Sequence, residues 1–138
     1  MDTLQCAIVL AKLTRFDWEI ERRMQMGGLY NQAMDEIGIS RVVQKRDRTS
    51  VFAQYTVLCD DRERTQALLT AAGVPTAVHY PSPMSRQDPY SQFCCGDCTP
   101  VADAISRKVL SLPMSADLAP QTIGGIADIL SGSVSVSA

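Results

Sequence analysis

The only histidine of this chain, His79, is followed by Tyr80 in the run GVPTAVHYP at residues 73–81. The glycine is typical of a helix end, the apolar residues predict a short strand, and the proline stops that strand. The pair is therefore expected at a strand-to-loop boundary, where scaffolds commonly present groups such as a titratable ring and a phenol to ligands. The alternative is a structural pair whose members hydrogen-bond only within the fold.

Three of the five cysteines, Cys94, Cys95 and Cys98, cluster in the run CCGDCTP at residues 94–100. The spacing of Cys95 and Cys98 suits a zinc site or a redox pair. A structural zinc site takes four ligands, however, and the sequence contains no second Cys-x-x-Cys pair. We therefore assign no metal ligand and expect reduced, structural thiols.

The elements that position these residues begin with a long helical region. Residues 1–36 predict one long bent helix or two helices in series, with Thr14 as the cap of a second helix and Gly27-Gly28 as a weak point. Such a helix is longer than a small domain needs for its own core. Its apolar face is therefore expected to pack on an absent domain or on another subunit.

The rest of the chain alternates short strands and helices. Strands are predicted at residues 39–43, 51–59 and 74–80, with a short strand or extended segment at residues 110–114. Helices are predicted at residues 63–72, from Pro100 with Thr99 as its cap, and from Pro120; Asp60 and Glu63 are expected to cap the first of these, and Gly73 to close it. This order predicts an α+β fold, with a small antiparallel or mixed sheet of about three strands, helices on one face and the long N-terminal helix before them. Residues 1–130 are expected to form the domain and residues 131–138 a flexible tail.

Composition narrows the possible partners. The 138 residues suit one domain, and a net charge of −2 argues against nucleic acid, which needs a basic excess. No apolar run approaches the ~20 residues that span a bilayer, so no membrane partner is expected. The first residues lack the basic region of a signal peptide, and a cytoplasmic location is therefore expected.

Several separated runs resemble one family: DTLQCAI at residues 2–8, QYT at 54–56, GVPTAVHYP at 73–81 and VLSLPM at 109–114. Together they are similar to the C-terminal part of the nucleotide-sugar aminotransferases of the DegT/DnrJ/EryC1/StrS group, from Asp2 to about Leu130. The segment at residues 94–100 resembles the bacterial polysaccharide members that aminate a UDP-linked 3-keto hexuronic acid.

The resemblance implies a homodimeric, two-domain fold like that of aspartate aminotransferase. The family's large domain holds pyridoxal phosphate and the lysine that forms the Schiff base, and its small C-terminal domain closes over the substrate. By this resemblance His79 and Tyr80 bind the sugar nucleotide. The implied reaction transfers an amino group, with glutamate as the expected donor, to a UDP-linked keto sugar for O-antigen or polysaccharide synthesis.

The chain departs from the family in its lysines. Lys12, Lys45 and Lys108 are its only lysines, and none stands in a setting like that of the family's cofactor lysine. We therefore assign no catalytic or cofactor-binding residue, and we expect the isolated chain to be inactive and to depend on a large pyridoxal-phosphate domain or a second subunit. The alternative is a non-catalytic dimerisation or binding module that uses the apolar face of its first helix.

Overall fold

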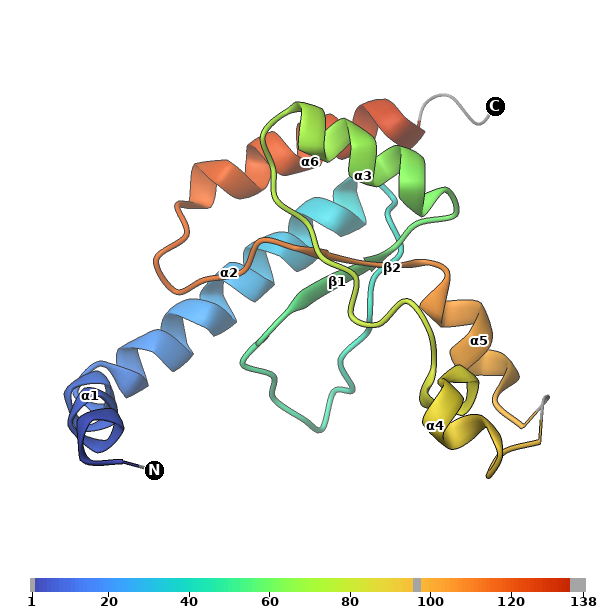
Figure 1. The fold of residues 1–138 in the computed structure, drawn as a ribbon. Helices are drawn as coiled ribbons and strands as arrows, with labels where there is room; N and C mark the ends of the chain where they lie inside the picture. The colour runs from blue at the N-terminus through green and yellow to red at the C-terminus, as the bar shows by residue number, and fades with distance from the viewer. Residues whose placement is uncertain (1, 96–97, 135–138) are drawn as a thin grey trace.

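The computed structural model describes residues 2–95 and 98–134. Two antiparallel strands and a set of helices make up this part of the chain (Figure 1), which confirms the α+β class. In chain order the elements are α1 (Thr3–Leu13), α2 (Phe16–Glu36), β1 (Tyr55–Leu58), α3 (Arg62–Ala71), the 3₁₀ turn η1 (Met84–Arg86), α4 (Asp88–Ser91), α5 (Pro100–Ser106), β2 (Val109–Leu112) and α6 (Pro120–Val134). None of the helices in these residues is long and apolar enough to cross a bilayer.

The N-terminal region forms two helices in series. Asp2 caps α1, its carboxylate accepting a hydrogen bond from the Gln5 amide at 2.8 Å. The prediction that Thr14 caps the second helix is wrong, because the Thr14 hydroxyl donates to the Ala11 carbonyl at 2.8 Å and Thr14 ends α1 instead. Helix α2 continues through Gly27-Gly28 without a break.

The sheet has two strands, not three. β1 pairs antiparallel with β2, and the register places Tyr55 opposite Leu112 and Val57 opposite Leu110. The segments expected as strands at residues 39–43 and 74–80 contribute one isolated bridge each, Arg41 with Val57 and Ala77 with Ser111. For residues 74–80 the reason is that Pro75 inside the segment and Pro81 after it lack the amide protons that a longer ladder needs.

One face of the sheet forms the core. Tyr55, Val57, Leu110 and Leu112 share this face by register, and all are buried. Side chains of α2, α3 and α6 pack against it, namely Met26, Tyr30, Met34, Leu69, Ile123, Ile126 and Leu130. At the centre the rings of Tyr30 and Tyr55 stack with centroids 4.5 Å apart, and the Tyr30 hydroxyl donates to the Pro113 carbonyl at 2.8 Å. Helix α2 is thereby fixed to the residue that follows β2.

Helix ends depart slightly from expectation. Asp61, not Asp60, caps α3, accepting a hydrogen bond from the Arg64 amide at 3.0 Å. Gly73 follows α3 with a φ of +77°, as expected of a glycine that closes a helix. Helix α6 continues to Val134, so residues 131–134 are helical and do not belong to a tail; residues 135–138 lie outside the described residues.

The neighbouring glycines of α2 give a matched pair for testing the packing. A Cβ at Gly27 would overlap the Phe52 ring, whereas a Cβ at Gly28 would meet nothing within 4 Å. We predict that Gly27→Ala lowers the free energy of unfolding by about 1–3 kcal/mol through overpacking. Gly28→Ala should raise it by about 0.5–1 kcal/mol through helix propensity. Urea titration followed by circular dichroism measures both, and equal effects of the two substitutions would contradict this packing.

The tyrosine pair predicts a loss of stability at high pH. Burial raises the pKa of Tyr55 to about 12, and it also raises the pKa of Tyr30. Since an unfolded tyrosine has a pKa of about 10, the unfolded chain releases these protons first, and the free energy of unfolding falls as pH rises from about 10 to about 12. Urea titrations across this range measure the slope. Tyr55→Phe should flatten it, and an unchanged slope in that variant would contradict the prediction.

Candidate functional site

The face of the sheet opposite the core carries the polar groups. Thr56 and Ser111 lie opposite one another in the register and share this face. The segment at residues 74–80 runs beside β2, held by hydrogen bonds from the Ala77 amide to the Ser111 carbonyl (3.1 Å) and from the Ser111 amide to the Ala77 carbonyl (2.8 Å). Because side chains alternate along an extended segment, this bridge brings His79 to the same face.

His79 is half-buried and its ring is held by a side chain of the sheet. Its Nδ1 atom lies 3.1 Å from the Ser111 Oγ, which in turn lies 3.2 Å from the Thr56 Oγ1. Tyr80 is 71% exposed, and its ring meets the His79 ring edge-on with centroids 5.8 Å apart. The structure therefore brings the two predicted residues together, with one ring anchored and the other in solvent.

His79 lies between two cavities. One, of about 480 Å³, is lined by His79 and Tyr80 on one side and by residues of η1 and α5 on the other, among them Met84, Ala102 and Ile105. The second, of about 270 Å³, is lined by His79 and Ser111 together with residues that precede β1 and follow β2. The imidazole is thus accessible from both sides, a position from which it could contact a bound ligand.

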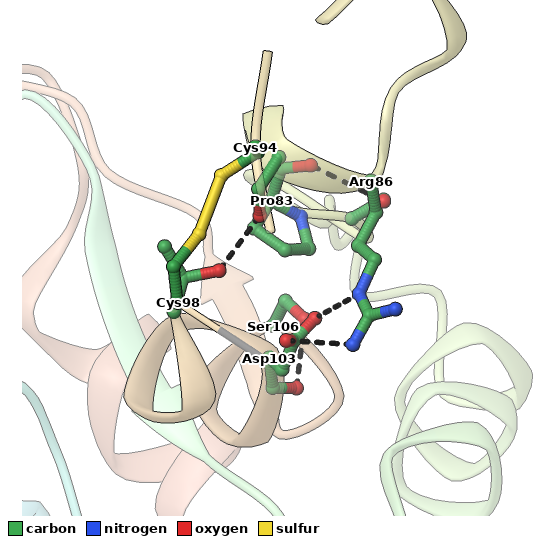
Figure 2. Close-up of polar contacts among 9 residues, drawn as sticks. Pro83, Arg86, Cys94, Cys98, Asp103 and Ser106 are labelled. Carbon is green, nitrogen blue, oxygen red and sulfur yellow. Dashed lines mark hydrogen bonds and ion pairs between the residues drawn. A yellow bond between two sulfur atoms is a disulfide. The ribbon is translucent and has the colours of Figure 1, made fainter. Parts of the chain in front are cut away.

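Residues of η1 and α5 line the larger cavity, and these two elements form a lobe with α4 (Figure 1). Figure 2 shows its polar contacts: the Arg86 guanidinium binds both carboxylate oxygens of Asp103, at 3.0 and 3.1 Å. These hydrogen bonds hold the pKa of Asp103 below its ordinary value. The hydroxyls of Ser85 and Thr99 lie 2.7 Å apart, and together these contacts join η1 to the start of α5.

The cysteine prediction requires correction. Cys94 and Cys98 form a disulfide in this lobe (Figure 2), whereas reduced thiols were expected, and the spacing that suited a redox pair was that of Cys95 and Cys98. The first and last cysteines of the cluster are thus the ones that pair, and Cys95 is free and exposed. Within residues 2–95 and 98–134, no three His, Cys, Asp or Glu side chains come together to hold a metal ion.

Sequence reasoning predicted His79 and Tyr80 as substrate-binding residues, which stays a prediction, and it did not single out Thr56 and Ser111. The available signal was Ser111 itself, a hydroxyl in the apolar run VLSLP that closes at Pro113. That Thr56 lies opposite Ser111 could not be known from local sequence, because 50 residues separate the end of β1 from the start of β2.

The comparisons with known proteins decide the family. The model of the DegT/DnrJ/EryC1/StrS aminotransferase family matches residues 1–131. The chain belongs to this family. Its members depend in general on pyridoxal phosphate.

Two curated relatives illustrate the similarity. A UDP-2-acetamido-2-deoxy-3-oxo-D-glucuronate aminotransferase of Pseudomonas aeruginosa is 44% identical over 114 residues, which cover 83% of this chain and 31% of the relative. A dTDP-3-amino-3,6-dideoxy-alpha-D-galactopyranose transaminase of Aneurinibacillus thermoaerophilus is 30% identical over 83% of this chain and 31% of the relative. The chain thus spans about a third of the length of the curated relatives it matches.

Solved structures agree with the family assignment. A DegT/DnrJ/EryC1/StrS aminotransferase from Brucella abortus superposes with a TM-score of 0.88 at 28% identity, covering 96% of this chain and 35% of the other. A protein of S. venezuelae, crystallised with a ketimine intermediate, gives a TM-score of 0.88 at 26% identity over 96% of this chain and 36% of the other.

The lysines of this chain do not fit pyridoxal phosphate. Lys12 is exposed on α1 and Lys45 is exposed in the segment between α2 and β1. Lys108 forms an ion pair with Asp60 at 2.6 Å. None of the three lines either cavity beside His79. Among the described residues, the site around His79 therefore lacks the amine that would hold this cofactor.

The disulfide predicts a definite labelling pattern. In denaturant without reductant, iodoacetamide should modify Cys6, Cys59 and Cys95 only, and all five cysteines after reduction. In the native protein the exposed Cys95 should react first, because burial raises the pKa of the Cys59 thiol. Peptide mass spectrometry measures each site. Modification of Cys94 or Cys98 in unreduced protein purified in air would contradict the disulfide.

Proposed function

We propose that this chain is the C-terminal, substrate-closing and dimer-contacting part of a pyridoxal-phosphate-dependent nucleotide-sugar aminotransferase. The complete enzyme would act in the cytoplasm as a homo-oligomer and transfer an amino group from glutamate to a UDP-linked keto sugar for O-antigen or polysaccharide synthesis. The observation that carries the proposal is the 44% identity to the Pseudomonas UDP-sugar aminotransferase, together with an accessible His79-Tyr80 pair at the rim of a cavity of about 480 Å³.

In this proposal the chain supplies substrate-binding groups. His79 presents an imidazole at the wall of the cavity, and Tyr80 presents an exposed phenol beside it. Both groups hydrogen-bond to oxygen atoms of the kind that a sugar nucleotide carries on its sugar and phosphates. The apolar walls contributed by η1 and α5 exclude water from the part of the substrate that enters the cavity.

Catalysis in this proposal needs residues from a large cofactor domain or another subunit. Transamination uses a lysine amine to hold the cofactor and to move a proton, and the three lysines here lie away from the two cavities. The isolated chain is accordingly proposed to be inactive and to bind no cofactor.

A second candidate, a non-catalytic dimerisation or binding module, is favoured by the surface of α1. This helix has no buried residue in the structure, and Leu4, Ile8, Leu10 and Leu13 are all at least 53% exposed. Helix α1 also projects from the far end of α2, away from the α4–α5 lobe (Figure 1). An apolar face of this kind marks an interaction surface in a soluble protein.

A chimera tests the first candidate. The segment of the Pseudomonas relative that aligns with this chain is replaced by the chain itself, and transamination of its UDP-keto sugar is measured. We expect activity, and we expect His79→Ala to lower kcat/KM by about tenfold to a hundredfold through loss of a hydrogen bond to a charged or polar substrate. Tyr90→Phe, at an exposed tyrosine of α4, is the matched control and should leave kcat/KM unchanged.

The isolated chain, mixed with pyridoxal phosphate and reduced with borohydride, is the second arm. A stoichiometric adduct at one lysine, or turnover by the isolated chain, would overturn the proposal that catalysis needs residues from elsewhere. A chimera that folds as an oligomer and binds the cofactor but does not turn over the sugar would overturn the enzymatic proposal and favour the binding module.

A further inference from the structure

Ser111 is a buried hydroxyl that requires a structural explanation. It is 5% exposed, and only Thr65 joins it among the buried polar residues of the described chain. The Thr65 hydroxyl donates locally to the Asp61 carbonyl, one turn earlier in the same helix region. The Ser111 hydroxyl instead lies between two side chains that are 55 and 32 residues away in the sequence, Thr56 and His79. Since a buried hydroxyl without partners is costly, this arrangement accounts for a polar residue in β2.

We propose that Thr56 and Ser111 are positioning residues that form a hydroxyl relay to His79, fixing its Nδ1 atom as an acceptor and presenting Nε2–H to the substrate. This inference rests on the proposed function for the identity of the substrate. It goes further by proposing which ring nitrogen of His79 carries the proton and which class of ligand atom the imidazole binds.

The direction of the relay follows from counting protons. Each hydroxyl donates one hydrogen bond, and a neutral imidazole carries one N–H. If Thr56 donates to Ser111 and Ser111 donates to Nδ1, both hydroxyl protons are used and the ring proton stands on Nε2. If Nδ1–H donates instead, Ser111 donates to Thr56 and the half-buried Thr56 hydroxyl must give its proton to water. The first direction satisfies every donor of the relay within the protein, and it is the one we propose.

The relay therefore selects the ligand atom. Nε2 stands on the edge of the ring opposite the atom that Ser111 holds, and an N–H there binds an acceptor. Phosphate, carboxylate and keto oxygens are acceptors without protons to donate, and all of them fit this position. An ammonium group, which only donates hydrogen bonds, does not.

The backbone reinforces the same geometry. Ser111 also exchanges two backbone hydrogen bonds with Ala77, two residues before His79. Ser111 therefore fixes both the path of the segment at residues 74–80 and the orientation of the ring that it carries. Replacing the Ser111 side chain removes its hold on the His79 ring but keeps the backbone hydrogen bonds to Ala77. The relay can therefore be tested without breaking this bridge.

The single histidine of the chain makes the relay directly measurable. In ¹⁵N NMR spectra of the 138-residue protein with a neutral imidazole, we expect one ring tautomer with the proton on Nε2 and a hydrogen-bonded Nδ1. Ser111→Ala should move the Nδ1 shift toward that of free imidazole, Thr56→Val should move it less in the same direction, and Ser111→Thr should restore it. Ser106→Ala, which lines the same cavity but donates to the Asp103 carbonyl, is the control and should leave it unchanged.

A kinetic arm in the chimera separates the relay from the proposed function. Ser111→Ala should raise KM for the UDP-keto sugar about threefold to tenfold, the effect of one hydrogen bond, with kcat changed less than about twofold. An unchanged Nδ1 signal in Ser111→Ala, or a ring proton found on Nδ1 in the original protein, would overturn the relay. The chimera could instead be inactive both with the original residues and with each variant, while the NMR spectra still show the expected Nδ1 signal and its changes. That result would overturn the proposed substrate and leave the relay in place.

Discussion

The antiparallel pairing of β1 with β2 is the constraint on which both the core and the site depend. In its register Tyr55 and Val57 meet Leu112 and Leu110 on the face that the helices cover. The same register places the Thr56 and Ser111 hydroxyls together on the opposite face. A slip of one residue would exchange these faces, burying hydroxyls in the core and exposing its apolar side chains. The core therefore selects the register, and the register assembles the polar site.

The site is built from segments that do not continue the sheet. The segment at residues 74–80 makes a single bridge to β2, and its prolines prevent a longer ladder. That short attachment still suffices to orient His79, because Ser111 holds the segment through its backbone and the ring through its side chain. The outer wall of the larger cavity is held separately, by the Cys94–Cys98 disulfide, the Arg86–Asp103 ion pair and the Ser85–Thr99 hydrogen bond.

Features that depend on neighbouring residues could be predicted from the sequence, and features that depend on distant pairing could not. Helical periodicity located α1, α2, α3, α5 and α6 but not the short η1 and α4, and the local run before Pro81 is what predicts His79 and Tyr80 as site residues. The expected third strand failed because alternation of side chains does not show whether a partner edge is available. The hydroxyls of Thr56 and Ser111 escaped notice because their contact depends on the register. The pairing of Cys94 with Cys98 could not be predicted, because the spacing of cysteines in a short cluster does not decide which of them pair. Family resemblance, in contrast, was predictable, since it rests on runs that are local in sequence.

The apolar residues of helix α1 are not explained by packing within the described fold. An isolated helix of 11 residues is marginal in water, and its stability normally comes from burying an apolar face. Here Leu4, Ile8, Leu10 and Leu13, which lie on both sides of the helix by their spacing, are all exposed. Both proposed functions explain these exposed apolar residues in the same way, because in each of them a large domain or a second subunit covers α1. The lysines lie away from the two cavities beside His79, so under the proposed function the amine comes from another domain or subunit. In that proposal, one partner that covers α1 and supplies the amine would meet both needs.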